Sequence, residues 1–394
     1  MSGFDGEIDP HSLIAEDLRE IYKLKRQERP HLSNKGTFGE DDENGENDSD
    51  NIWVKYDLPL WRSHELNGEA WEELKRRLLE SVVLGNEVAI VEGGDVREKV
   101  RLHERENRPV LIRGLMESWS GYKTGSLTFR GLRNRFPQVP FRFSDTHGGM
   151  LDLETYGAYC LHPLQGMVDD SPLAVYDSEF GDDDMTSPLL QEYEVPTCFG
   201  EDLFHLAEEA EEEGTSNPPY RWILCGPPRS GTGLHIDPLM TSAWVALVEG
   251  LKMWCLFPRG TKGYKIGVRD GETGVQISSS IWFKDYFWKF LKGDLDERPH
   301  VVLQRPGETV YVPSGWYHLV LNLEHSTAVT HNYAEDNGAE SNRVEEMWDV
   351  VKEEEKEFAV RWRKGLKEKR PDLEERLKKM TQRSNNDLMT DFDD

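Results

Sequence analysis

Three side chains in this sequence have the types and spacing of metal ligands. His235 and Asp237 stand two residues apart in GTGLHIDP, and residues i and i+2 of a strand point to the same face. His318 lies in the alternating segment YHLVLNL and could supply a third ligand from another strand. Two histidines and one carboxylate leave open positions on a ferrous ion for a chelating co-substrate and O₂, although catalytic zinc also uses this set. Without context, the HxD pair and a lone core histidine are common patterns.

The elements that must position these ligands are short strands. From Tyr220 to about Tyr333 the pattern is of strands separated by Gly and Pro turns, which predicts an all-β unit. Three strands are expected close together, as in a jelly roll: Glu308–Val312, Tyr317–Leu323 and Ser326–Tyr333. One helical insert is expected around Phe283–Leu291. The predicted class is mainly β with flanking helices (α+β), with the jelly-roll barrel at 220–335.

The chain before the barrel divides into two parts. Residues 1–51 end in an acidic stretch without aromatic residues, which predicts a disordered segment because it buries too little apolar surface. Residues 52–219 are expected to pack on the barrel. They contain a predicted helix at Glu69–Leu79, a predicted strand at Arg108–Gly114, and the segment Glu201–Gly214, expected to be helical at first and then an acidic loop.

After the barrel, residues 340–380 form a segment rich in Glu, Lys and Arg with apolar residues at approximate helical spacing. This helical segment could pack back on the domain or form a homodimer interface. The irregular apolar stripe lacks sustained heptads and favours packing. Residues 381–394 are expected to be a flexible tail.

Charge and cysteine content narrow the class of protein. The formal net charge of -27 over 394 residues repels polyanions, so direct binding to duplex nucleic acid is not expected. The acidity serves solubility or attracts a basic protein or peptide. The four cysteines form no CxxC pair and are expected to be reduced. No apolar segment approaches the ~20 residues needed to cross a bilayer, so we expect a soluble intracellular protein without membrane association.

Two long motifs place these residues in a family context. The first runs from Gly226 to Pro258 and contains GPPRSGTGLHIDP, TSAW and KMWCLFP, and the second is PGETVYVPSGWYHLVLNLEHSTAVTHNYA from Pro306 to Ala334. Both closely resemble the jumonji-C oxygenases, nearest to the phosphatidylserine-receptor-like subgroup of lysyl hydroxylases and arginine demethylases. Weaker likeness includes RPVLIRGLMESW, SPLAVYDSEFG and PPYRW, so the resemblance covers about Trp53–Ala334.

This resemblance implies a double-stranded β-helix that uses Fe(II), 2-oxoglutarate and O₂, with ascorbate as a supporting reductant. His235, Asp237 and His318 match the iron ligands. Lys252 matches the lysine that binds the distal carboxylate of 2-oxoglutarate, with Thr232 as the assisting hydroxyl. A buried dicarboxylate needs such a cation and donors.

Two further polar residues are assigned by the resemblance alone. Thr330 and Asn332 alternate on the following strand and match the region of polar co-substrate contacts, while their alternative role is to line the barrel. Two departures from the subgroup concern Val245, where an asparagine is expected after TSAW, and a tyrosine that is replaced near Met150.

The expected activity is hydroxylation of lysine or arginine side chains in a basic protein, or N-demethylation through hydroxylation of an N-methyl carbon. The family also implies residence in the nucleus, with the cytoplasm as the alternative. Two other classes stay open on the residues: a non-catalytic binding module for basic protein segments, and a zinc cupin-type hydrolase or isomerase.

Overall fold

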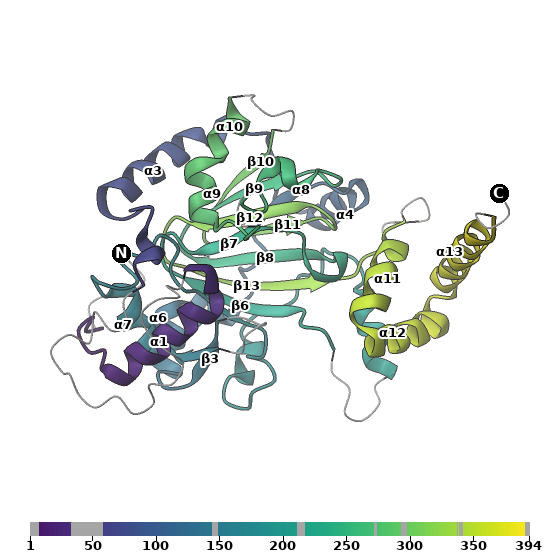
Figure 1. Ribbon diagram of the computed structural model, residues 1–394. Coiled ribbons are helices and arrows are strands. Elements are labelled where there is room, and N and C mark those ends of the chain that lie inside the picture. The colour runs from purple at the N-terminus through teal and green to yellow at the C-terminus, as the bar shows by residue number, and fades with distance from the viewer. Residues whose placement is uncertain are drawn as a thin grey trace.

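The computed structural model describes residues 8–32, 58–143, 149–210, 217–271, 274–292, 298–336, 338 and 342–390, with the backbone alone for 208–210 and 381–390. Its centre is a barrel of two facing sheets (Figure 1). The core strands are β6 (Arg221–Gly226), β7 (Gly231–His235), β8 (Ser242–Glu249), β9 (Lys252–Phe257), β10 (His300–Gln304), β11 (Glu308–Val312), β12 (Tyr317–Asn322) and β13 (Ser326–Tyr333).

The strand order is that of a double-stranded β-helix. One sheet has the order β10-β9-β12-β7, and the other has β11, β8, β13 and β6 as central neighbours, extended by β1 (Ala89–Val91) and β2 (Val110–Arg113) on one side and β5 (Val175–Asp177) on the other. All core pairs are antiparallel. The predicted jelly-roll core is thereby confirmed, and the three expected strands correspond to β11, β12 and β13.

Alternation along the strands explains why the sheets face each other. On β8, Ala243, Val245 and Leu247 belong to an apolar cluster inside the barrel, which also contains Trp254 of β9 and Val310 of β11. The intervening Trp244 and Ala246 of β8 belong instead to the large cluster under the N-terminal elements. A period of two therefore buries both faces of the strand.

Helices cover the outer faces of both sheets (Figure 1). Three helices cover the four-stranded sheet: α3 (Gly68–Ser81), α9 (Ser279–Asp285) and α10 (Phe287–Leu291). Helix α3 corresponds to the helix predicted at Glu69–Leu79, and α9 and α10 correspond to the helical insert predicted at Phe283–Leu291. The seven-stranded sheet packs under the N-terminal elements. These include α1 (Ala15–Glu28), α4 (Val96–Glu106), α5 (Ser120–Thr124), α6 (Phe129–Arg135), α7 (Leu153–Leu161), and the hairpin of β3 (Pro140–Arg142) and β4 (Met150–Asp152).

The prediction that residues 1–51 are disordered is wrong for 8–32. Within α1, Leu18, Ile21 and Leu24 form an apolar face that is almost fully buried, and Lys25 pairs with the buried Asp169. The acidic stretch at 40–50 dominated the composition of residues 1–51, so the helical spacing of these apolar residues was missed. That stretch lies outside the described residues, as do 1–7 and 33–51.

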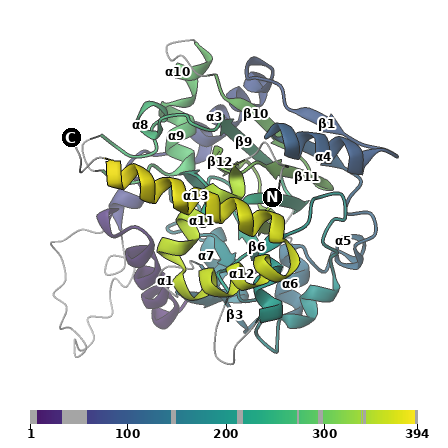
Figure 2. The same cartoon turned by 90° about the vertical axis from the view of Figure 1, so that its right-hand side faces the viewer.

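The C-terminal segment forms three helices that pack within the chain: α11 (Arg343–Glu354), α12 (Lys356–Lys369) and α13 (Pro371–Thr390). Figure 2 views this helical group face-on. Its apolar side chains share a cluster with the 3₁₀ helix η6 (Leu203–Ala210), which lies in the segment Glu201–Gly214 that was predicted to be helical at first and then an acidic loop. The apolar residues of the C-terminal helices therefore pack within the chain, as one of the two alternatives predicted. A homodimer stays a prediction.

The segment 381–394 was predicted as a flexible tail, and the backbone of its residues 381–390 continues α13 as a helix. Pro371 begins this helix at a position where proline's fixed φ suits the first turn. Across the described ranges, no helix is both long and apolar enough to cross a membrane.

Candidate active site

The three predicted metal ligands meet at one end of the barrel. His235 ends β7 and pairs in register with His318 near the start of β12, so the two imidazoles lie side by side with ring centroids 4.1 Å apart. Asp237 follows in extended conformation, which keeps its side chain on the same face as His235. The Nε2 atoms of His235 and His318 each lie 3.7 Å from Oδ1 of Asp237.

Each histidine is oriented by a carbonyl oxygen. Nδ1 of His235 lies 2.8 Å from the carbonyl of Gly233, and Nδ1 of His318 lies 3.2 Å from that of Trp316. When each Nδ1–H donates to its carbonyl, each Nε2 presents a lone pair to the space beside Asp237. Burial, followed by the proximity of His235, lowers the pKa of His318 to about 4, so this imidazole is neutral at pH 7.

The donor set fits a divalent ion. The 3.7 Å separations exceed hydrogen-bond length, and Oδ2 of Asp237 is buried without a hydrogen-bond partner among the described residues. A buried carboxylate oxygen left in this way costs free energy unless a cation satisfies it. Within the described residues, these three side chains are the group whose ligand atoms lie close enough to hold a metal.

A cavity of about 210 Å³ connects the triad to the other predicted residues. Its walls come from β5, β6, β7, β8, β9, β12 and β13. All seven residues singled out in the sequence line it: Thr232, His235, Asp237, Lys252, His318, Thr330 and Asn332. The barrel therefore collects side chains that are up to 100 residues apart, as an interior formed by antiparallel strands allows.

Lys252 supplies a cation at the base of this cavity. Its side chain is buried and donates a hydrogen bond of 2.7 Å to Oδ1 of Asn322, and no described carboxylate lies within ion-pair distance of it. Burial lowers the pKa of Lys252 to about 8. A buried ammonium whose neighbour is a neutral amide favours an anionic ligand, because an anion would offset the cost of desolvation.

Asn322 and Tyr176 are residues of this cavity that the sequence analysis did not assign. Asn322 shares the inward face of β12 with His318, four residues earlier, and donates to Oγ of Ser230 at 2.8 Å. The alternation of β12 could have identified it. Tyr176 lies on β5, and its hydroxyl is 3.1 Å from Oγ1 of Thr232. Its segment, SPLAVYDSEFG, weakly resembles the jumonji-C family, but its position in the sequence does not indicate that it lies near the other site residues.

The two departures from the subgroup pattern have different positions. Val245 lines the cavity and presents an apolar surface there. Met150 lies on β4 with 41% of its surface exposed and does not line the cavity. The association of Met150 with the co-substrate site is therefore corrected: a tyrosine hydroxyl beside Thr232 is provided by Tyr176.

The comparisons with known proteins assign the chain to a family. Residues 222–333 match the JmjC domain, hydroxylase. The chain is 34% identical over 289 residues to the bifunctional arginine demethylase and lysyl-hydroxylase psr-1 of Caenorhabditis elegans, covering 72% of this chain and 68% of that protein. The chain belongs to the JmjC hydroxylase family. This confirms the family and the enzyme class predicted from the motifs.

Other JmjC relatives share smaller parts of their length. The lysine-specific demethylase JMJ21 of Arabidopsis thaliana is 38% identical over 233 residues, which are 57% of this chain and 23% of that protein. The 2-oxoglutarate and iron-dependent oxygenase JMJD4 of Danio rerio is 32% identical over 139 residues, which are 34% of this chain and 30% of that protein. The chain thus spans less than a quarter of the length of JMJ21.

A larger cleft adjoins the cavity of this JmjC hydroxylase. It measures about 740 Å³ and shares Ala174, Tyr176, Gly231 and Thr232 with the cavity, so the Tyr176–Thr232 contact stands at the junction. One wall is formed by residues 28–32 at the end of α1, and another by residues from 269–270 and 274–286. Four carboxylates and two guanidinium groups line it: Glu28, Asp170, Asp270, Asp285, Arg29 and Arg269.

Proposed function

We propose that this chain is an Fe(II)- and 2-oxoglutarate-dependent oxygenase that hydroxylates lysine or arginine side chains of basic proteins, or demethylates them where the attacked carbon is an N-methyl group. The observation that carries the proposal is one cavity containing both an open triad of His235, Asp237 and His318 and a buried ammonium, that of Lys252. A structural metal site would not need the second feature. The relatives named above support the same class of reaction.

The residues divide the work between metal, co-substrate and substrate. When bound, Fe(II) and 2-oxoglutarate supply the activation of O₂, with one oxygen atom entering a substrate C–H bond and the other entering succinate as CO₂ leaves. His235, Asp237 and His318 would hold the ion. Lys252 would bind the distal carboxylate of 2-oxoglutarate, while Thr232, Thr330 and Asn332 contribute polar contacts. Trp254 and Val320 line the same cavity and exclude water from it.

The adjoining cleft supports a polypeptide substrate. Because the cleft shares Tyr176 and Thr232 with the cavity of the triad, a lysine or arginine side chain of a peptide lying in the cleft would enter the cavity past Tyr176. The excess of carboxylates over guanidinium groups in the cleft walls, together with the net charge of -27, favours a basic segment. We propose nuclear residence with this substrate class, on the family resemblance and the demethylase names of the relatives.

The proposal is tested by succinate release from 2-oxoglutarate. We expect release that requires Fe(II) and is abolished in His235→Ala, while His11→Ala, a change of an exposed histidine, retains it. Mass spectrometry of lysine- and arginine-rich peptides, methylated and unmethylated, should show gain of one oxygen or loss of a methyl group. Binding of such peptides without succinate release would indicate a binding module, and zinc retained after anaerobic purification would indicate hydrolase-type chemistry.

A further inference from the structure

The loop that follows Asp237 has an unfavourable backbone conformation. Leu239 and Met240 both have positive φ, at 55° and 59°. A non-glycine residue in the left-handed region costs about 1–3 kcal/mol where the surrounding structure enforces it. Two such residues in succession, beginning two positions after the proposed metal ligand Asp237, mean that other contacts must hold this loop in place.

The first of these contacts is apolar and comes from the C-terminal helices. Leu239 is 93% buried in the cluster formed by α11, α12, α13 and η6, where Val344, Met347 and Val351 of α11 are also buried. Met240 packs against the same cluster. The side chain two residues beyond Asp237 is therefore part of the C-terminal core rather than of the barrel.

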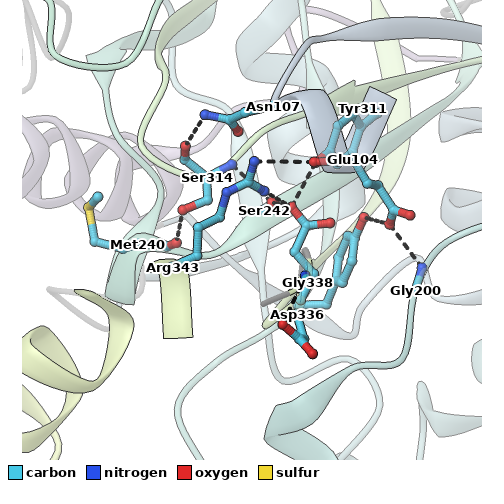
Figure 3. Close-up of polar contacts among 12 residues, drawn as sticks. Glu104, Asn107, Gly200, Met240, Ser242, Tyr311, Ser314, Asp336, Gly338 and Arg343 are labelled. Atoms are coloured by element: carbon cyan, nitrogen blue, oxygen red, sulfur yellow. Dashed lines mark hydrogen bonds and ion pairs between the residues drawn. The ribbon is translucent and has the colours of Figure 1, made fainter. Parts of the chain in front are cut away.

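The second contact is a chain of hydrogen bonds across both ligand-bearing segments (Figure 3). Oγ of Ser314 donates to the carbonyl of Met240 at 2.6 Å, and the amide of Ser314 donates to Oγ of Ser242 at 2.9 Å. Oγ of Ser242 in turn donates to Glu335, which also accepts from Arg343 of α11 at 2.5 Å. Ser314 precedes His318 by four residues, so one hydroxyl ties the loop of Asp237 to the segment leading into His318.

We infer that Leu239 and Ser314 are positioning residues through which the C-terminal helices fix Asp237 and thereby set the metal affinity of the site. Oδ2 of Asp237 accepts no hydrogen bond among the described residues, so the backbone of its loop sets the direction of the carboxylate together with the neighbouring Asn332 and His235 side chains. Loss of either contact allows Leu239 and Met240 to relax from positive φ and turns the carboxylate from the two imidazoles. The inference rests on the proposed role of the triad as a metal site.

Calorimetric titration with Mn(II), a redox-stable substitute for Fe(II), tests this without turnover. Leu239→Ala and Ser314→Ala should each raise the Mn(II) Kd about 10-fold or more, as loss of groups that orient ligands does. Leu239→Met keeps an apolar side chain of similar volume, so its Mn(II) Kd should stay within about twofold of the wild type. The matched control is Leu373→Ala, which removes a fully buried leucine of the same cluster on α13, away from the loop.

The outcomes separate this inference from the proposed function. If the wild-type chain binds no Mn(II), both the proposed metal site and this inference are contradicted. Wild-type binding with unchanged Kd in Leu239→Ala and Ser314→Ala, or an equal loss in Leu373→Ala, overturns the inference alone. If Leu239→Ala does not fold, Ser314→Ala decides, because it removes one hydroxyl and creates little void.

Reciprocal coupling gives a second readout. If the helices stabilise the metal-bound loop, bound metal stabilises the helices by the same free energy. Mn(II) should therefore slow hydrogen exchange of the amides of α11 in the wild type, and this protection should disappear in Leu239→Ala. Protection of α11 that persists in the variant would contradict the inference.

Discussion

At the scale of single residues, the proposed role of Lys252 predicts that 2-oxoglutarate binding depends on pH. Its pKa is lowered by burial to about 8, and only the protonated ammonium attracts a dicarboxylate. The affinity for 2-oxoglutarate, titrated in the presence of Mn(II), should therefore be nearly constant below pH 7 and fall about 10-fold per pH unit well above pH 8. Lys252→Arg keeps its charge, so its weaker binding should show no such decline. An equally steep decline in both proteins would mean that a group other than Lys252 causes the pH dependence.

Tyr176 offers a second prediction for a single residue. Tyr176→Phe removes the hydroxyl that lies 3.1 Å from Thr232 but keeps the ring at the junction of cavity and cleft. One lost hydrogen bond of about 1 kcal/mol should raise KM for 2-oxoglutarate about fivefold and leave kcat within twofold. Steady-state succinate release measures both. A fall in kcat with unchanged KM would place the hydroxyl near the reacting substrate instead.

What the sequence predicts at this scale depends on motif length. The i, i+2 spacing of His235 and Asp237 and the alternation around His318 predicted side chains on inward faces. The resemblance to the jumonji-C family assigned these three residues as metal ligands and added Lys252 and Thr232. Tyr176 escaped because it comes from a strand outside the two long motifs, and only the β5–β6 pairing brings it to the cavity. Its distance from Thr232 depends on tertiary structure, which no local spacing encodes.

At the scale of elements, α1 is expected to govern access of the polypeptide substrate. Lys25 and Asp169 form a buried ion pair of 2.6 Å that attaches this helix to the turn before β5. Lys25→Ala leaves the buried carboxylate of Asp169 without its ion-pair partner, which costs about 3–5 kcal/mol. The wall formed by residues 28–32 should loosen, although Arg29 still donates hydrogen bonds to Ser171. We expect KM for a basic peptide to rise at least fivefold while KM for 2-oxoglutarate stays unchanged.

The same helix supplies the control. Lys23 pairs with Glu20 on the exposed face of α1, where ion pairs contribute little, so Lys23→Ala should change neither KM. Peptide kinetics that do not distinguish Lys25→Ala from Lys23→Ala would exclude α1 from the substrate path.

Elements were predicted best where periodicity was strong. The strands of the barrel and α3 were expected because alternation and the i, i+3, i+4 pattern are local. The helix α1 was missed because the acidic stretch that follows it dominated the composition of residues 1–51, although Leu18, Ile21 and Leu24 carry the helical spacing. Helix α13 exceeded its expected end because backbone hydrogen bonds of a helix continue through polar residues.

At the scale of the whole molecule, the C-terminal helices and the barrel meet at a buried cluster of charges. Glu104 of α4 and Glu335 after β13 are both fully buried, with Arg343 of α11 between them, and Tyr311 donates to Glu335. Burial, reinforced by the Glu104 carboxylate, raises the pKa of Glu335 from 4.5 to about 7. We therefore expect the docking of the C-terminal helices on the barrel to be coupled to protonation of Glu335.

This linkage predicts how stability changes with pH. Between pH 4.5 and 7 the folded chain holds a proton on Glu335 that the unfolded chain has released, so this group's contribution to the free energy of unfolding decreases as pH rises through that range. Glu335→Gln cannot titrate at this position. The free energy of unfolding of the wild type, minus that of the variant, should therefore fall by on the order of 1–3 kcal/mol from pH 4.5 to 7.5. Urea unfolding at successive pH values measures it. Glu353→Gln, on the exposed side of α11, should unfold in parallel with the wild type at every pH. Parallel curves for Glu335→Gln as well would mean that Arg343 keeps Glu335 ionised throughout, and that the helices dock on the barrel through a permanent ion pair instead of a protonated carboxyl group.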